Sequence, residues 1–153
     1  MHRRAVLLSL LAAAAARPAR AQDVYESSAG PMRLETVAAG LDHPWSLAFL
    51  PDGRMLVSER RGDLRVITRE GRLSDPVAGL APIAAVGQGG LLDIALHPRF
   101  AETRLVFMSF AEARGDGVGA SGMRGRLAED LTRLEDGTVI FRQQPAVSGG
   151  QHF

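Results

Sequence analysis

The feature that most constrains the fold of this chain is an internal repeat with an offset of 47 residues. The segment "WSLAFLPDGRMLVS" at 45–58 aligns with "LDIALHPRFAETRLVFMS" at 92–109, so that "LAF" falls on "IAL" and proline falls on proline. A period in the forties, with about four strands per repeat, is typical of a β-propeller blade. The apolar-small-apolar start of each copy suits an innermost strand beside the crowded propeller axis.

Short apolar runs separated by turn residues continue along the chain, and no amphipathic stretch of a dozen residues indicates a long helix. This pattern predicts an all-β protein built of successive hairpins. Glycine and proline place turns at "PDG" (51–53), "RRGD" (60–63), "REG" (69–71) and "EDG" (135–137). The expected strands are 34–38, 45–50, 54–58, 64–68, 91–96, 104–110, 123–128 and 138–142.

The repeat also predicts how many blades are present. Propellers close with typically four to eight blades, whereas residues 45–142 supply about two, and a third innermost strand would begin just past Phe153. The strand expected at 34–38 would be the outermost strand of the last blade in a closed ring. We therefore expect an N-terminal propeller fragment with an open ring and exposed edge strands that favour association.

The first residues have the pattern of an export signal. A basic start with Arg3 and Arg4 precedes an apolar run at 5–16, and Ala19 and Ala21 form the A-x-A cleavage pattern. The run has 12 residues, fewer than the ~20 that a membrane-spanning helix needs. The sequence predicts a signal peptide at 1–21, cleavage near Ala21, and a periplasmic or secreted domain at 22–153 without a membrane span.

Composition argues against several classes of function. The chain has no cysteine, which removes disulfides, thiol catalysis and Cys-ligated zinc, and no H-x-x-H or H-E-x-x-H pattern indicates a zinc site. Four of the eighteen arginines lie in the expected signal, which leaves fourteen against seventeen acidic residues, a net charge of −3. Neither a basic stripe nor a row of aromatic residues points to nucleic acid.

Residues 117–122 spell G-x-G-x-x-G, a spacing found in dinucleotide-binding sites. The motif follows an expected strand, but no core-facing helix and no βαβ unit follow it. We therefore expect a flexible hairpin loop at this position.

Two glycine-rich loops carry the candidate site residues. "VGQGGLL" at 86–92 leads into the second innermost strand, and "SGGQHF" at 148–153 would lead into a third. Such loops crowd around the propeller axis, and glycine lets the backbone approach a ligand closely. They present Gln88 and His152. His43 and His97, each before a proline, are expected to be turn or packing residues, with axial lining as the alternative for His43.

These segments resemble a known family. "GLDHPWSLAFLPDGRMLVSERRGDLRVI", "VGQGGLLDIALHPRF" and "VIFRQQPAVSGGQHF" are similar to motifs of the periplasmic pyrroloquinoline-quinone (PQQ)-dependent sugar dehydrogenases, the soluble glucose/sorbosone or aldose dehydrogenase family. The resemblance covers nearly all of the chain after residue 21. It implies a six-bladed propeller, with PQQ and calcium at the axial face.

The resemblance also implies a reaction. Gln88 would bind the cofactor, and His152 would be the general base that takes the proton from the anomeric hydroxyl of an aldose while hydride passes to PQQ. Imidazole suits this role because its unperturbed pKa near 6.5 leaves it largely neutral. An external electron acceptor is the other expected partner. The alternatives are a frayed terminal residue for His152 and a loop-bonding residue for Gln88.

The chain departs from the family pattern in three ways. Gln151 stands where the glucose dehydrogenases carry an acidic residue, which favours a broader aldose specificity. Leu131 stands where a turn glycine is expected, which predicts a distorted hairpin before Thr132. The other PQQ-binding residues and the calcium ligands of the family come from later blades, so activity of the isolated fragment is in doubt.

Two other functions stay open on the sequence alone. A non-catalytic propeller that binds a partner would keep the scaffold without the cofactor. A lactonase-type propeller hydrolase would place acidic metal ligands on the innermost strands, where Asp93 is the only candidate. Oxidation of an aldose is the function that the motifs favour.

Overall fold

The structure is a computed structural model that describes residues 24–151. The chain divides into two units between Glu35 and Thr36. In the first unit, β1 (Val24–Ser27) and β2 (Gly30–Arg33) form an antiparallel hairpin. The expected signal peptide with its cleavage site at Ala21, and the candidate base His152, lie outside the described residues.

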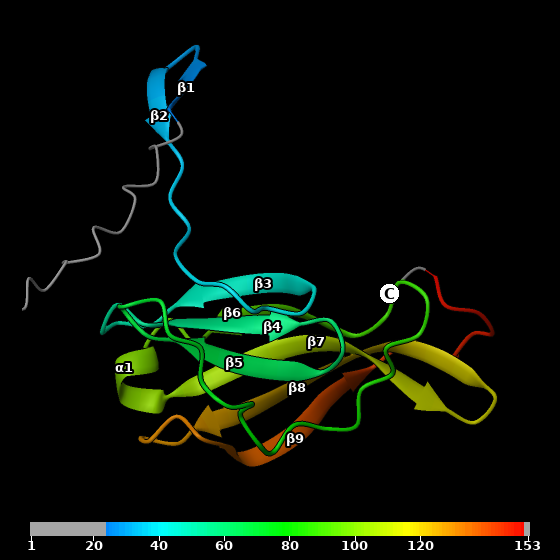
Figure 1. Ribbon diagram of the computed structural model, residues 1–153. Coiled ribbons are helices and arrows are strands. Elements are labelled where there is room, and N and C mark those ends of the chain that lie inside the picture. Colours follow the sequence, from blue (N-terminus) through cyan, green and yellow to red (C-terminus); the bar gives the residue numbers. More distant parts are fainter. Residues whose placement is uncertain (1–23, 152–153) are drawn as a thin grey trace, which may run out of the picture. The chain divides into compact units, whose positions relative to one another are not determined.

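The second unit begins with a three-stranded antiparallel sheet, shown in Figure 1, in the order β3-β4-β5. Its strands are β3 (Pro44–Phe49), β4 (Met55–Glu59) and β5 (Asp63–Ile67). Gly53 and Gly62 turn the chain between them with φ values of 85° and 121°, which glycine reaches without steric cost. Together with the turn that contains Gly71, they confirm the turns predicted at 51–53, 60–63 and 69–71.

An irregular segment completes this sheet beyond β5. The N–H groups of Ser74 and Val77 donate to the carbonyl oxygens of Val66 and Leu64, at 2.8 and 2.7 Å. Residues 73–77 therefore occupy the place of a fourth strand, as expected for a blade of about four strands.

A four-stranded antiparallel sheet follows, in the order β6-β7-β8-β9. A single helical turn, α1 (Phe100–Thr103), joins its first two strands and buries Phe100. Within residues 24–151 this is the only α-helix, which confirms the all-β prediction, and no helix there is long and apolar enough to cross a membrane. The strands are β6 (Leu91–Leu96), β7 (Leu105–Arg114), β8 (Gly117–Leu127) and β9 (Leu134–Arg142).

The two sheets repeat the same pairing geometry, which confirms the repeat of 47 residues. Ala48 of β3 pairs with Leu56, and 47 positions later Ala95 of β6 pairs with Phe107. Both innermost strands also have a register shift near their start, between Pro44 and Ser46 in one and between Leu91 and Ile94 in the other.

A hydrogen bond to a serine side chain also recurs at the register shift of each sheet. The N–H of Ser46 donates to Oγ of Ser58 (3.1 Å), and the N–H of Asp93 donates to Oγ of Ser109 (3.0 Å). The two copies of the repeat therefore share individual hydrogen bonds as well as strand pairing.

The hydrophobic core includes the contact between the two sheets. A large apolar side chain contributes about 1.5–3 kcal/mol to stability when it is fully buried. Where β3 and β6 lie side by side, Oγ of Ser46 donates to Oδ1 of Asp93 at 2.6 Å, which joins equivalent positions of the two copies. The strand residues of this core are Leu56, Leu64, Val66, Leu91, Ile94, Val106, Met108, Phe110, Met123, Leu127 and Leu134.

The strand predicted at 34–38 is wrong. These residues are irregular, because among the described residues they have no neighbouring strand with which to form a ladder. Ala38 and the nearby Leu41 instead pack against Met55, Val57 and Ile67 on the outer side of the first sheet.

The hairpin loop predicted at 117–122 is also wrong, because these residues form the first half of β8. The turn lies just before them, and β7 and β8 pair over ten residues, from Leu105 to Arg114. Glycine suits this strand because other groups approach its backbone: the carbonyl oxygen of Val147 lies beside Gly117 and the guanidinium of Arg114 beside Gly119.

The turn predicted at 135–137 is a bulge inside β9, where Asp136 has a φ of 54° and the register with β8 shifts. The chain reverses earlier, around Leu131, whose φ of 62° confirms that the position favours glycine. The predicted distortion is not present, since Leu131 N–H donates to Ala128 O at 3.0 Å and Ala128 N–H to Arg133 O at 2.9 Å. Burial of the Leu131 side chain in the core offsets the backbone strain.

Substitutions at Leu131 separate these two effects. Leu131→Ala should lower the free energy of unfolding by about 2–5 kcal/mol, because a buried side chain is lost. Leu131→Gly should be about 1 kcal/mol more stable than Leu131→Ala, because glycine relieves the strain at positive φ. Urea denaturation measures both values.

Leu134 provides the control, because it is equally buried but has no positive φ. There the order should reverse, and Leu134→Gly should be less stable than Leu134→Ala. A Leu131→Gly variant that is less stable than Leu131→Ala would contradict the assignment of strain.

Candidate active site at the glycine-rich loops

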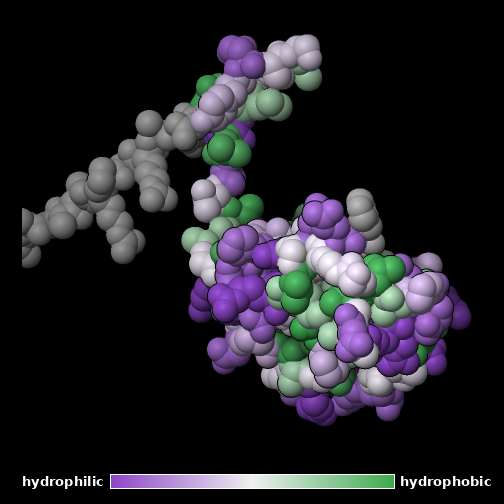
Figure 2. All heavy atoms as spheres, turned by 90° about the vertical axis from the view of Figure 1, so that its right-hand side faces the viewer, coloured by the Kyte–Doolittle hydropathy of each residue, from purple (hydrophilic) through white to green (hydrophobic). Residues whose placement is uncertain are grey.

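Three loops meet at the end of the two sheets where the innermost strands begin (Figure 1). They are the turn between β4 and β5, the loop at 86–90 before β6, and residues 147–151. The N–H of Gln88 donates to the carbonyl oxygen of Gly150 at 2.6 Å. The two loops that the sequence singled out are thus in direct contact. Figure 2 views this side of the second unit and shows apolar side chains gathered between hydrophilic ones.

Glycine is required where these loops touch. Gly87 has a φ of 57°, and a Cβ there would overlap the carbonyl oxygen of Gly150. Gly90 has a φ of 149°, and a Cβ there would overlap the carbonyl oxygen of Arg60. At Gly87 and Gly90, glycine thus allows the loops to approach other backbone segments of the protein itself.

Arg60 connects the loops. Its Nη1 donates to the carbonyl oxygens of Gly87 (2.6 Å) and Gly89 (3.2 Å), on either side of Gln88. Its backbone N–H donates to His43 O, and its carbonyl accepts from Leu91 N–H, both at 3.0 Å. Hydrogen bonds from a charged donor are stronger than neutral ones, so Arg60 holds the backbone from which the Gln88 side chain projects.

Sequence reasoning missed Arg60. It lies in the "RRGD" turn, and neither its residue type nor its spacing distinguishes it from the adjacent Arg61. Arg61 is 71% exposed and pairs with Asp42 at 3.1 Å. Only the approach of the 86–90 loop in the folded chain separates the two arginines.

His43 lies at the same end, at the start of β3. Its φ of 51° confirms a turn, and its exposed ring is hydrogen-bonded through Nδ1 to the carboxylate of Asp42. His43 and then Arg61 hold the pKa of Asp42 below its usual value. The N–H of Asp42 donates to Oε1 of the buried Glu59 at 2.6 Å, which anchors this turn to the sheet.

The other candidates lie apart from these loops or have structural partners. His97 follows β6 at the opposite end, where its ring stacks on Phe107 with the centroids 6.4 Å apart, so the predicted packing role is confirmed. The carboxylate of Asp93 accepts from Ser46 Oγ (2.6 Å) and Ile94 N–H (2.9 Å).

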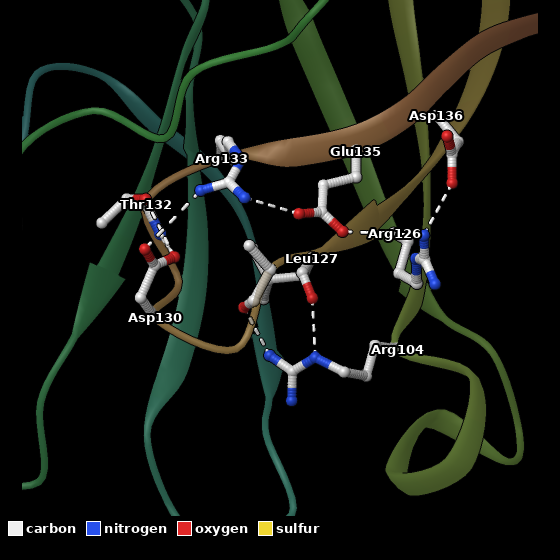
Figure 3. Close-up of polar contacts among 9 residues, drawn as sticks. Arg104, Arg126, Leu127, Asp130, Thr132, Arg133, Glu135 and Asp136 are labelled. Atoms are coloured by element: carbon white, nitrogen blue, oxygen red, sulfur yellow. Dashed lines mark hydrogen bonds and ion pairs between the residues drawn. The ribbon is translucent and has the colours of Figure 1, made fainter.

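A cavity of about 420 Å³ opens at the opposite end, around the α1 side of the second sheet. Figure 3 shows that several of its charged groups have partners: Arg133 pairs with Glu135 at 2.7 Å, and Arg126 pairs with the nearby Asp136 at 2.8 Å. The guanidinium of Arg104 donates to the carbonyl oxygens of Leu127 and Ala128, at 2.6 and 2.5 Å. These arginines and carboxylates therefore hold together the turn between β8 and β9.

The described residues do not by themselves form a cofactor site. Between residues 24 and 151, no group of three or more His, Asp or Glu side chains is arranged to hold a metal ion. The guanidinium of Arg60, which contacts the residues on both sides of Gln88, donates to their carbonyl oxygens. Gln88 and the loop backbone could therefore provide only part of a quinone site.

Comparison with known proteins identifies the family. Residues 41–153 match the glucose/sorbosone dehydrogenase family. The chain belongs to this family. It is 44% identical over 124 residues to the aldose sugar dehydrogenase YliI of Escherichia coli (strain K12), which covers 80% of this chain and 33% of that protein. It is 36% identical over 148 residues to an uncharacterized protein of Synechocystis, covering 89% and 34% of the two chains.

Solved structures agree. The soluble aldose sugar dehydrogenase from E. coli in the apo-form has a TM-score of 0.75 and 44% identity, covering 78% of this chain and 35% of that one. The PQQ-bound form of aldose sugar dehydrogenase from Streptomyces coelicolor has a TM-score of 0.57 and 31% identity, covering 84% and 36%. The chain spans about a third of the length of these relatives. The predicted fold is confirmed: the chain is all-β and forms part of a β-propeller, about two blades.

Arg60→Ala tests the anchoring of the Gln88 loop. Loss of its charged hydrogen bonds, each contributing about 1.5–3 kcal/mol, should speed hydrogen exchange of the amides at 87–91 by ~10-fold or more. Mass spectrometry or NMR measures this exchange. Arg61→Ala is the matched control and should leave these amides unchanged, because Arg61 contacts Asp42 instead. Equal exchange in both variants would contradict the role of Arg60.

Proposed function

We propose that this chain provides the first blades of a PQQ-dependent sugar dehydrogenase that oxidises an aldose at its anomeric hydroxyl. The observation that carries the proposal is the contact of Gln88 with Gly150, in a chain whose residues 41–153 match the sugar dehydrogenase family. Both loops lead toward innermost-strand positions, where the axial face of a propeller lies. The PQQ-bound relative supports the choice of cofactor.

Gln88 is proposed to contact the cofactor through its side-chain amide. A binding residue must be held by rigid neighbours to be effective. Three contacts meet this condition: the backbone bond to Gly150, and the two bonds from Arg60 to Gly87 and Gly89.

His152 is proposed to be the general base. It follows Gly150 by two residues, which reach at most ~7 Å of extended chain, so the contact between Gly150 and Gln88 supports a shared site. The neutral imidazole accepts the proton of the anomeric hydroxyl as the O–H bond breaks and the C1–O double bond of the lactone forms. PQQ, when bound, accepts the hydride from C1. An external acceptor then removes the two electrons.

Calcium is proposed as a second cofactor on the family resemblance, with ligands from outside the described residues. The same resemblance favours a broad aldose substrate, since Gln151 replaces an acidic residue.

Activity of the full-length protein that contains this chain tests the proposal. With PQQ and calcium added, it should reduce a dye in the presence of aldoses, and His152→Ala should lower kcat by ~10²–10⁴-fold. His97→Ala is the control and should keep its activity, because His97 packs on Phe107 at the other end of β6. Retained activity in His152→Ala would refute the base assignment. Absence of both PQQ binding and dye reduction would favour a non-catalytic binding propeller.

We further propose that residues 1–21 are a signal peptide and that the sugar dehydrogenase domain begins at Gln22, in the periplasm or outside the cell. The basic start, the short apolar run and the A-x-A pattern support this. N-terminal sequencing of the protein exported by a bacterial host should begin at Gln22. An exported or cytosolic product that retains Arg3 and Arg4 would overturn the proposal.

A further inference from the structure

The hairpin of β7 and β8 extends beyond the innermost strand of its sheet. β6 pairs with β7 as far as Phe110, whereas β7 and β8 stay paired as far as Arg114 and Gly117. We call this extension, residues 111–120, the β7–β8 arm; Figure 1 shows it in yellow, beside the red segment that follows β9. In the first sheet, Glu59 at the end of β4 pairs with both neighbouring strands, so the equivalent hairpin has no arm. The second copy of the repeat therefore has an addition at the end where the candidate site lies.

One strand of the arm binds the segment that contains Gln88. The N–H of Ala111 donates to the carbonyl oxygen of Gly90 at 2.9 Å, and the carbonyl oxygen of Ala111 accepts from the N–H of Ala84 at 2.8 Å. Ala111 is buried, so water does not compete for these bonds. The arm thus fixes this segment on both sides of the loop that Arg60 holds.

The other strand of the arm binds the segment that leads into the second loop of the site. Val118 and Val147 exchange two backbone hydrogen bonds, at 2.9 and 3.0 Å. The N–H of Gln143 also donates to the carbonyl oxygen of Ala120, at 2.8 Å. Val147 precedes Gly150 by only three residues. The arm therefore contacts both of the segments whose loops meet at the candidate site.

A carboxylate on the arm holds this second contact in place. Glu112 is 14% exposed and accepts from Oγ of Ser121 at 2.8 Å and from Nε and Nη2 of Arg142 at 2.8 and 3.1 Å. It also pairs with Nε of Arg114 at 3.5 Å. Nη2 of Arg114 in turn donates to the carbonyl oxygen of Gln143 at 2.7 Å. Glu112 thus holds one arginine at the end of β9 and another that binds the backbone just beyond β9.

The negative charge of Glu112 is stabilised in this position. Hydrogen bonding from Arg142, and then from Ser121, lowers the pKa of Glu112 below its usual value, although burial opposes the shift. The carboxylate is therefore ionised at neutral pH, and hydrogen bonds between ionised groups are stronger than neutral ones. A glutamine at position 112 would keep the shape of the side chain and lose the charge that both arginines contact.

Two glycines of the G-x-G-x-x-G pattern allow the arm to be packed so closely. A Cβ at Gly117 would overlap the carbonyl oxygen of Val147. A Cβ at Gly119 would overlap the guanidinium of Arg114, which crosses this position to reach Gln143. Glycine within a strand is typical where another group approaches the backbone. The pattern therefore serves the contact between the arm and the segment after β9.

We propose that the β7–β8 arm positions the two loops of the candidate site relative to each other, with Glu112 as the positioning residue. Glu112 acts through its two arginine partners on residues 143–147, and through this segment on the contact between Gly150 and Gln88. The placement of the loops does not depend on the proposed function. The effect on catalysis rests on it, because His152 is proposed to be the base on the same loop.

Hydrogen exchange of the full-length protein that contains this chain tests the placement. Glu112→Gln should speed exchange of the peptides that cover 84–91 and 142–151 by ~10-fold or more, because a charged anchor of the second segment is lost. Mass spectrometry measures both peptides. Glu102→Gln is the matched control and should leave them unchanged, since Glu102 lies exposed on α1 at the opposite end of the sheet.

Gly119→Ala separates positioning from the loss of a buried charge. The added Cβ displaces the guanidinium of Arg114 from Gln143 and leaves Glu112 and Arg142 in place. This variant should therefore speed exchange in the same two peptides. The displaced group is the end of a flexible side chain, so the fold should be retained, which circular dichroism verifies.

Steady-state kinetics test the link to catalysis. At saturating PQQ and calcium, Glu112→Gln should lower kcat and kcat/KM by the same factor, ~10-fold or more, with KM for the aldose unchanged. The reason is that a displaced base acts less well in the transition state while the sugar still binds. Glu102→Gln should keep its activity.

The outcomes distinguish this inference from the proposed function. Unchanged exchange at 84–91 in both Glu112→Gln and Gly119→Ala would overturn the role of the arm. Faster exchange that extends equally to β3–β5 would also overturn it, because it would show a general loss of stability. Selective exchange together with an unchanged kcat would overturn the positioning of His152. Selective exchange in a protein that oxidises no aldose would support the arm and refute the proposed function.

Discussion

The rest of the structure depends on one contact, the face-to-face packing of two sheets that begin with side-by-side innermost strands. Ala48 provides the small side chain that lets these strands approach, and the Ser46–Asp93 hydrogen bond joins them at equivalent positions of the repeat. Close packing at native density leaves little tolerance for larger groups at such a contact. Because the contact is made between equivalent residues, it determines the relative register of both sheets.

This packing also determines where the candidate site lies. Two strands that start at the same end of the unit bring the segments before them together, so the turns at His43 and at Gln88 become neighbours although 45 residues separate them in the sequence. Arg60 then reaches the carbonyl oxygens on both sides of Gln88, and Gly150 approaches from the far end of the chain. The loops are close because the strands behind them are close.

Much of the fold could be predicted from the sequence because local signals were strong. Turns with glycine at positive φ, such as Gly53 and Gly62, and the strand at 91–96 were predicted correctly. The errors arise where tertiary contacts override local composition. Residues 117–122 look like a loop but form a strand because β7 extends beside them, and residues 34–38 look like a strand but have no ladder partner among the described residues. Arg60 was missed for the same reason.

The sequence by itself determined the repeat, the all-β class, the family and the two loops that carry Gln88 and His152, since periodicity and motifs are written in residue order. The tertiary structure alone decided that the Gln88 loop touches Gly150, that Arg60 rather than Arg61 anchors it, and that Leu131 is buried at a strained φ. The physical reason is that such contacts join residues tens of positions apart. Their geometry depends on the packing of complete sheets, which no local pattern encodes.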